Sequence, residues 1–188
     1  MFENMICITD RKVCAVPFLE QIEKVCALKP LALILREKDL SGEEYLRIAK
    51  QVQPICQKEG VKFVVHTFWQ AALVLGVNCI HMPLPLLKNM TAEEKSCFSC
   101  IGSSVHSIDE ALAAVKLGAG CLVAGHIYAS SCKAGAAPRG LGFLREVCAA
   151  VNMPVYAIGG IGLNAVQFKE VETCGAAGAC LRSALMQF

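Results

Sequence analysis

The sequence predicts an α/β fold: one compact TIM (β/α)8 barrel over residues 1–188, with its last helix truncated. Eight short apolar segments alternate with segments of helical periodicity. The apolar segments lack the polar alternation of half-exposed strands, so they are predicted to be buried on both faces, as in a parallel sheet. A doubly wound open sheet is the alternative, because sequence alone does not determine the number of strands.

In the first half of the chain, strands are predicted at residues 5–8, 31–35, 62–65 and 78–81, each an apolar run that ends near polar residues. Helical spacing predicts helices at 16–28, 41–58 and 69–75. Ser41 and Glu44 form the capping-box pattern that begins the second helix. Met82–Leu87 contains no acidic residue and is predicted to be an apolar loop at the barrel mouth.

In the second half, strands are predicted at residues 99–102, 121–124, 154–158 and 178–181. Thr91 caps a helical turn at 92–94, and helices follow at 108–116, 144–151 and 164–174. Gly118 stops the first of these helices, and Asn164 opens the last. About one helical turn remains after the final strand, which is why the last helix is expected to be truncated.

The composition excludes several classes of protein. The chain is 55% hydrophobic and 18% charged with a net charge of +2, so it is neither disordered nor broadly basic enough to bind nucleic acid. No apolar run reaches the roughly 18 residues of a membrane span. The twelve cysteines lie mostly in apolar or helical segments, where free cysteine behaves as a small core residue. With no signal peptide, a reduced cytoplasmic protein is expected.

The four histidines all fall at or just beyond a predicted strand end: His66, His81, His106 and His126. In a TIM barrel the chemistry is located at the carboxyl ends of the strands. His126 is the strongest candidate because it precedes the fourteen-residue segment from Ile127 to Gly140, and long loops in compact domains are usually functional. A histidine there changes charge near neutral pH. His81 and His106 are also compatible with purely structural roles.

Two groups of residues are candidates for binding anions. Arg36 and Lys38 follow the second strand in alternation, so their side chains are expected on the same side, where they suit a carboxylate or a phosphate. A solvated charge cluster with the neighbouring acids is the alternative. After strands seven and eight come Gly159-Gly160 and Arg182-Ser183, the places where TIM barrels often hold a phosphate on backbone N–H groups.

Several short motifs in a fixed order resemble one known family. They are Ile8-Thr9-Asp10, Leu35-Arg36-Glu37-Lys38-Asp39-Leu40, Gly102-Ser103-Ser104-Val105-His106-Ser107, Gly125-His126-Ile127-Tyr128, Lys133, Pro138-Arg139-Gly140-Leu141 and Ala157-Ile158-Gly159-Gly160-Ile161. Together they are similar to the thiamine phosphate synthase superfamily, a TIM-barrel group, over nearly the whole chain. One branch, the synthase, joins a pyrimidine diphosphate to a thiazole phosphate with magnesium. The TenI-like branch aromatises the thiazole phosphate by moving a proton.

Departures from the synthase pattern favour the TenI-like branch. The synthase usually has Asn-Asp-Arg after strand three, where this chain has His66-Thr67-Phe68. It usually has an acidic residue after strand four, where Met82–Leu87 has none. Magnesium prefers carboxylate oxygens, so diphosphate chemistry is not favoured. His126 stands where the synthase tends to have proline, and with Cys132-Lys133 it resembles the tautomerase pattern.

The resemblance implies a thiazole tautomerase of thiamine biosynthesis, an isomerase that needs no metal and no cofactor. Its implied partner is a small phosphorylated thiazole, with self-association left open. His126 is the implied general acid and base, with Cys132 as a second proton carrier. The substrate-binding residues are predicted to be Arg36, Lys38, His66, Lys133, Gly159, Gly160, Arg182 and Ser183. Two alternatives remain: a thiamine phosphate synthase with an altered metal site, and a non-catalytic barrel that binds thiazole phosphate and has a regulatory role.

Overall fold

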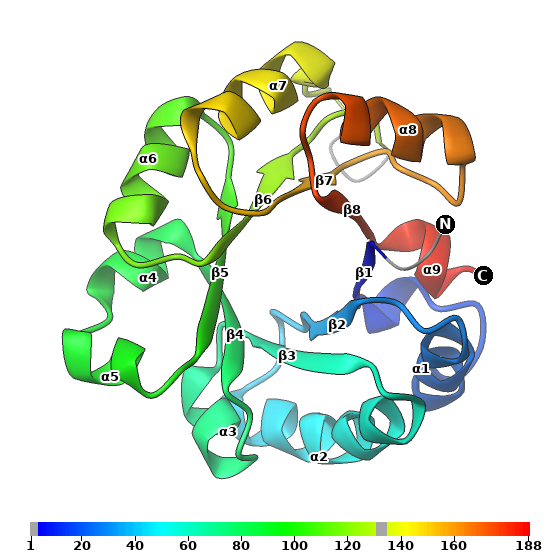
Figure 1. Cartoon of the computed structure of the whole chain (residues 1–188). Coiled ribbons are helices and arrows are strands. Elements are labelled where there is room, and N and C mark those ends of the chain that lie inside the picture. Colours follow the sequence, from blue (N-terminus) through cyan, green and yellow to red (C-terminus); the bar gives the residue numbers. More distant parts are fainter. Residues whose placement is uncertain (1–3, 131–134) are drawn as a thin grey trace.

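The computed structural model describes residues 4–130 and 135–188, and it confirms the TIM barrel. Eight parallel strands pair in chain order, and β8 returns to pair with β1, so the sheet is a closed ring surrounded by helices (Figure 1). Closure excludes the doubly wound alternative, which would leave two open edges. The strands are β1 (Met5–Ile8), β2 (Ala32–Leu35), β3 (Lys62–His66), β4 (Cys79–Pro83), β5 (Cys100–Val105), β6 (Cys121–Gly125), β7 (Val155–Ile158) and β8 (Gly178–Leu181).

The helices mostly follow the predicted order. They are η1 (Arg11–Val13), α1 (Phe18–Ala27), α2 (Gly42–Glu59), α3 (Trp69–Val74), α4 (Leu84–Asn89), α5 (Ala92–Ser96), α6 (Ile108–Lys116), α7 (Gly140–Ala150), α8 (Ala165–Thr173) and α9 (Ser183–Met186). The capping boxes of Ser41 and Thr91 are present, and Asn164 caps α8. The final helix, α9, is the single truncated turn that the sequence predicted.

Three local predictions were wrong. The apolar segment Met82–Leu87 is not a loop: its first two residues end β4, and the rest begins α4. The helix predicted from Leu144 begins four residues earlier, at Gly140. β5 extends to Val105 instead of ending at Gly102, because Ser103 and Ser104 continue the pairing with β6. The small polar residues had suggested a loop, but the barrel buries Ser103 completely.

The hydrophobic core has two layers, as expected for a barrel. A small cluster fills the inside of the ring, and a larger one lies between the strands and the surrounding helices. The inner cluster consists of Ile6, Ile8, Ala32, Ile34, Val123 and Cys180. All eleven cysteines of the described ranges are free thiols, and six of them are buried, in line with the predicted core role. Within those same ranges, no helix is long and apolar enough to cross a bilayer.

Candidate active site

A cavity of about 710 Å³ opens at the carboxyl ends of the strands. All four histidines line it, and so do all the predicted binding residues that the structure describes: Arg36, Lys38, His66, Gly159, Gly160, Arg182 and Ser183. Cys132 and Lys133 lie outside the described residues, so their predicted roles stay predictions. The residues predicted from their positions at strand ends therefore lie together, at the end of the barrel where TIM-barrel active sites are found.

The charged side chains that follow β2 point in two opposite directions. Arg36 and Lys38 line the cavity, whereas the carboxylate of Glu37 points the other way and is buried. Glu37 accepts hydrogen bonds from Thr9 Oγ1 at 2.7 Å and from Arg11 Nη1 at 3.0 Å. Because the neighbouring acid is turned away, the two cations present their charge to the cavity. The prediction that Arg36 and Lys38 point to the same side is thus correct. The alternative of a solvated charge cluster is wrong for Glu37, because this side chain is buried.

The electrostatics of this wall favour a negatively charged ligand. Burial and the nearby Arg36 and Arg182 lower the pKa of Lys38, because a second and third cation disfavour its charged form. The carboxylate of Asp10 lies 3.6 Å from Arg182 Nη1 and neutralises only part of this charge. An anion in the cavity would relieve the repulsion among the three cations.

Tyr45 fixes the ends of β2 and β3 relative to each other. Its side chain is fully buried, and its hydroxyl donates to the carbonyl of Leu35 at 2.7 Å. The same hydroxyl accepts from the backbone N–H of His66 at 3.1 Å. Tyr45, a residue of α2, therefore connects the backbone of Leu35, just before Arg36, to the backbone of His66. No feature of the sequence pattern had singled out Tyr45.

His66 and His81 form a stacked pair of neutral rings with centroids 5.4 Å apart. His66 Nδ1 is 2.7 Å from Thr67 Oγ1, and His81 Nε2 is 2.8 Å from Ser104 Oγ. Burial, then the neighbouring His81, Arg36 and Lys38, lower the pKa of His66 to about 2. Burial and Arg36 lower the pKa of His81 to about 4. Both rings are therefore uncharged at neutral pH and act as polar, neutral walls.

These two pKa values predict a specific loss of stability in acid. The unfolded chain takes up protons on both histidines below about pH 6.5, and the folded chain resists this. Stability present above pH 6.5 is therefore lost as the pH falls toward the folded values of about 4 and about 2. We expect urea unfolding to show a decline of up to about 2–3 kcal/mol per pH unit between pH 6 and pH 4. His81→Asn should reduce that slope by about half, and an unchanged slope would contradict this account.

His126 directly follows β6 and is 6% exposed. Its Nε2 lies 3.4 Å from the carbonyl oxygen of Ala136, which can only accept a hydrogen bond. Its Nδ1 is buried and has no hydrogen-bond partner within the described ranges. Buried polar atoms are nearly always paired, so an unpaired ring nitrogen at the cavity requires an explanation. The simplest is that Nε2 carries the hydrogen and Nδ1 keeps a lone pair for a ligand.

The loop after β6 packs directly on the two glycines after β7. A Cβ atom added to Gly159 would lie 2.3 Å from Cβ of His126, and one added to Gly160 would lie 2.3 Å from the carbonyl oxygen of Ala129. Both glycines also have positive φ angles. The pair is therefore needed for His126 and its loop to sit where they do, in addition to any role toward a phosphate. A bulky residue at Gly160 would displace the loop and would not test phosphate binding alone.

His106 has a supporting position at the edge of the cavity. Its Nδ1 lies 2.7 Å from the carbonyl oxygen of Gly125, the residue before His126. Its backbone N–H donates to Glu110 Oε2 at 2.6 Å. His106 thus holds the end of β6, while Glu110 caps the loop that carries His106. The sequence had placed His106 near the site but could not show this contact, which depends on the pairing of β5 with β6.

The cavity does not fit a magnesium site. Magnesium takes oxygen ligands, usually from carboxylates, and Glu110 is the single carboxylate among the described residues that line the cavity. That carboxylate already accepts a backbone hydrogen bond. Across residues 4–130 and 135–188, no group of three or more His, Cys, Asp or Glu side chains is placed to hold a metal ion. The donor set is instead cationic and imidazole-rich.

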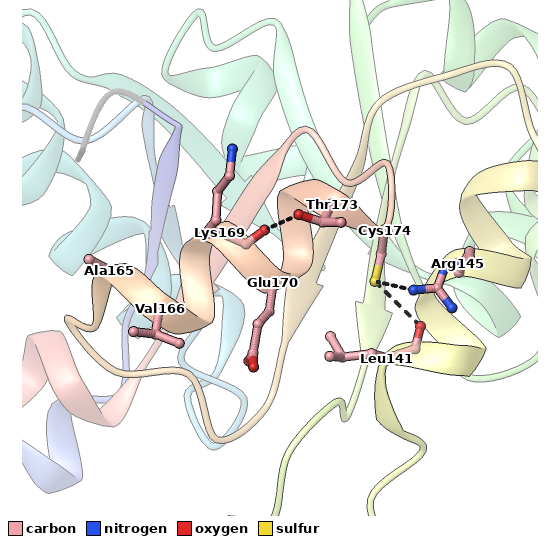
Figure 2. Close-up of a pocket in the computed structure, with 8 residues that line it drawn as sticks. All are labelled: Leu141, Arg145, Ala165, Val166, Lys169, Glu170, Thr173 and Cys174. Atoms are coloured by element: carbon pink, nitrogen blue, oxygen red, sulfur yellow. Dashed lines mark hydrogen bonds between the residues drawn. The ribbon is translucent and has the colours of Figure 1, made fainter.

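A second hollow, of about 440 Å³, lies on the outer surface between α7 and α8 (Figure 2). Its floor includes Cys174, whose thiol contacts the carbonyl of Leu141 at 3.6 Å and Arg145 Nη2 at 3.9 Å. None of the four histidines or the cations described above lines it. It shares no lining residue with the cavity at the strand ends and is not a candidate for the chemistry.

Comparison with known proteins identifies a family for this chain. The family model described as thiamine monophosphate synthase matches residues 5–185. A thiamine-phosphate synthase of Desulfitobacterium hafniense (strain Y51) is 32% identical over 97% of this chain and 89% of that protein. A thiamine-phosphate synthase of Clostridium tetani is 31% identical over 90% of this chain and 83% of that protein.

Solved structures show the same fold. A thiamine phosphate pyrophosphorylase from Pyrococcus furiosus superposes with a TM-score of 0.83 at 27% identity, covering all of this chain and 88% of that one. FabK from Thermotoga maritima superposes with a TM-score of 0.74 at 15% identity, covering 98% of this chain and 59% of that one, which shows the fold alone.

The fold and the site define a TIM barrel whose mouth holds cationic side chains beside imidazole groups. The chain belongs to the thiamine monophosphate synthase family, a family of thiamine biosynthesis. The family that the sequence motifs resembled is thereby confirmed.

Proposed function

We propose that this protein is a thiazole tautomerase, which aromatises a carboxylated dihydrothiazole that bears an ethyl phosphate. The observation that carries the proposal is the buried Nδ1 of His126 at the cavity, which has no partner among the residues that the structure describes. A tautomerase needs one group that is first a base and then an acid, and a neutral imidazole can serve as both. No redox step and no leaving group are involved.

The charges of the cavity match such a substrate. A carboxylate and a phosphate together carry about three negative charges at neutral pH, and Arg36, Lys38 and Arg182 supply three positive ones. Arg36 and Lys38 follow β2, whereas Arg182 follows β8 beside the Gly159-Gly160 turn. We assign the carboxylate to the first pair and the phosphate to the second group. This places the thiazole ring between them, across the mouth that His126 borders.

The proton then moves in two steps. Nδ1 of His126 accepts the ring proton, and the electron pair of the broken C–H bond enters the ring system. The imidazolium returns a proton to the exocyclic carbon, which leaves an aromatic thiazole and a neutral imidazole. Arg36 and Lys38 stabilise the negative charge that develops toward the carboxylate between these steps. The neutral His66 and His81 add polar walls without competing for the proton.

Thiamine phosphate synthase is the second candidate, and the names of the relatives favour it. That reaction transfers a pyrimidine from its diphosphate to the thiazole phosphate with magnesium. The donor set of the cavity does not fit magnesium, as described above. We therefore place the tautomerase first, on the residues that line the site.

A two-substrate assay separates these functions. We expect the purified protein to convert the dihydrothiazole to the aromatic thiazole in the presence of EDTA. With the pyrimidine diphosphate, the thiazole phosphate and millimolar magnesium, we expect no thiamine phosphate above background. A synthase of the same family, assayed in parallel, controls for reagent quality. Magnesium-dependent formation of thiamine phosphate would reverse the order of the two proposals, and binding of the thiazole without either reaction would indicate the regulatory role.

A further inference from the structure

A group of thiols lies at the opposite end of the barrel from the candidate active site. Cys79, Cys100 and Cys121 are the first residues of β4, β5 and β6, three neighbouring strands. Cys79 is the pairing partner of Cys100. Cys121 pairs with Gly102, two residues along β5 from Cys100. Because the strands are parallel, all three thiols lie at the amino-terminal end of the ring.

The three side chains also point to the same side of the sheet. A Cβ atom on Gly102 would lie 3.1 Å from Sγ of Cys121 and 2.7 Å from Nδ1 of His81, a ring that lines the cavity inside the barrel. Residues two apart on a strand share a face, so Cys100 faces inward with Gly102, and Cys79 faces inward with His81. The three cysteines therefore form one cluster that faces the inside of the barrel at its amino-terminal end. Cys100 and Cys121 are partly exposed to solvent.

The surroundings of Cys100 favour its thiolate. The neighbouring thiol of Cys121, the charge of Lys62 and the thiol of Cys79 together outweigh burial and lower the pKa of Cys100 below that of an ordinary thiol. Tyr156 on β7 also faces this group of charges. The neighbouring thiol of Cys100, burial and the charge of a Cys100 thiolate raise the pKa of Cys121. Cys100 is thus favoured as the nucleophilic thiolate, and Cys121 remains a protonated thiol.

We propose that Cys100 is a peroxide-reactive thiol at the amino-terminal rim of the barrel and that Cys121 resolves its oxidised form into a disulfide. The arrangement combines a partly exposed thiol, a lysine at the same rim and a second thiol on the adjacent strand. Such features distinguish redox-active cysteines from inert buried ones. A metal site is not favoured, because the described side chains include no group of three placed to hold an ion.

The chemistry balances with hydrogen peroxide as the oxidant. The Cys100 thiolate attacks one peroxide oxygen; an S–O bond forms, the O–O bond breaks, and hydroxide leaves to become water. Cys100 is then a sulfenic acid, which no longer carries the charge that holds Cys121 protonated. The Cys121 sulfur attacks the sulfenic sulfur; an S–S bond forms, the S–O bond breaks, and a second water leaves with the proton of Cys121. Two thiols and one peroxide give one disulfide and two waters.

The chain contains an internal control for proximity. Cys26 and Cys56, on α1 and α2, have their sulfur atoms 3.8 Å apart, but both side chains are fully buried. If closeness alone decided oxidation, this pair would be bridged first. The proposal predicts instead that one equivalent of hydrogen peroxide bridges Cys100 to Cys121 in the native protein, found as a linked peptide by mass spectrometry. A bridge between Cys26 and Cys56, or no new bridge, would overturn it.

Two substitutions and a pH profile sharpen the test. Cys121→Ser should leave a sulfenic acid on Cys100 that a dimedone probe traps, whereas Cys100→Ser should abolish peroxide uptake at the rim. Cys97→Ser, which removes an exposed thiol on the outer surface, should change neither result. Alkylation of Cys100 by iodoacetamide in the wild type should rise much less steeply from pH 5 to pH 8 than the rise of roughly several hundredfold expected for an ordinary thiol. A steep, ordinary profile would contradict the proposal. None of these readouts uses enzymatic activity, so the result is independent of the proposed function.

Discussion

His126→Asn should lower kcat for aromatisation of the dihydrothiazole by about 10²- to 10⁴-fold and leave KM nearly unchanged. The imidazole is buried at the cavity, and its Nδ1 has no partner within residues 4–130 and 135–188. Asparagine keeps the approximate size of the side chain but cannot shuttle a proton. Turnover, measured by the absorbance of the aromatic product, and the melting temperature should be recorded on one preparation. The melting temperature should stay within a few degrees of the wild type.

His106→Asn is the matched comparison, because it changes a second histidine of the same cavity. That ring contacts the carbonyl of Gly125 and supports the end of β6, so its loss should reduce kcat by no more than about tenfold. Equal losses in both variants would indicate that the site was distorted and not that a proton carrier was removed. If His126→Asn turns over normally, His126 is not the catalyst and His66 becomes the next residue to test.

Arg182→Met and Arg36→Met should weaken binding of the thiazole product by about 10- to 100-fold each, but through different groups of the ligand. A hydrogen bond to a charged group contributes about 1.5–3 kcal/mol, which corresponds to this range. Calorimetry should therefore show that Arg182→Met has little effect on an analogue without the phosphate. Arg36→Met should have little effect on an analogue without the carboxylate.

Asp10→Asn provides the control for the arginine at β8. It breaks the same ion pair of 3.6 Å as Arg182→Met but retains the cation. Asparagine also preserves the side-chain oxygen that caps η1 through the N–H of Lys12. Both members of the pair are partly exposed, so its loss should have little effect on stability. Ligand affinity in this variant should be unchanged or higher. If both arginine variants lose affinity equally for every analogue, the two anion sites are not separate.

The sequence predicted best those features that local rules determine. The bounds of α6 match the prediction because Ser107 caps its start and the glycine that follows Leu117 ends it. The cavity histidines were placed by strand-end position alone. α4 was missed because Pro83 and Pro85 suggest a loop. Proline is nevertheless tolerated in the first turn of a helix, because the backbone N–H groups there make no hydrogen bond within the helix.

Features that depend on the closure of the barrel could not be read from the chain. Glu37 belongs by sequence to a charged run, yet it is buried because Thr9 and Arg11, on the neighbouring β1 connection, satisfy its oxygens. The thiol cluster of Cys79, Cys100 and Cys121 likewise depends on the register of three strands. A shift of one residue in any strand would turn one thiol to the other face of the sheet.

The central claim is that this barrel moves a proton on a thiazole through His126, and a reaction in deuterium oxide tests it most directly. The dihydrothiazole carboxylate phosphate should be mixed with an equal amount of enzyme, and the product followed by proton NMR. The account predicts rapid formation of the aromatic thiazole with deuterium at the exocyclic carbon in the wild type, and a rate near background in His126→Asn. Equal rates in the two proteins, or no conversion above the uncatalysed reaction in the wild type, would contradict it.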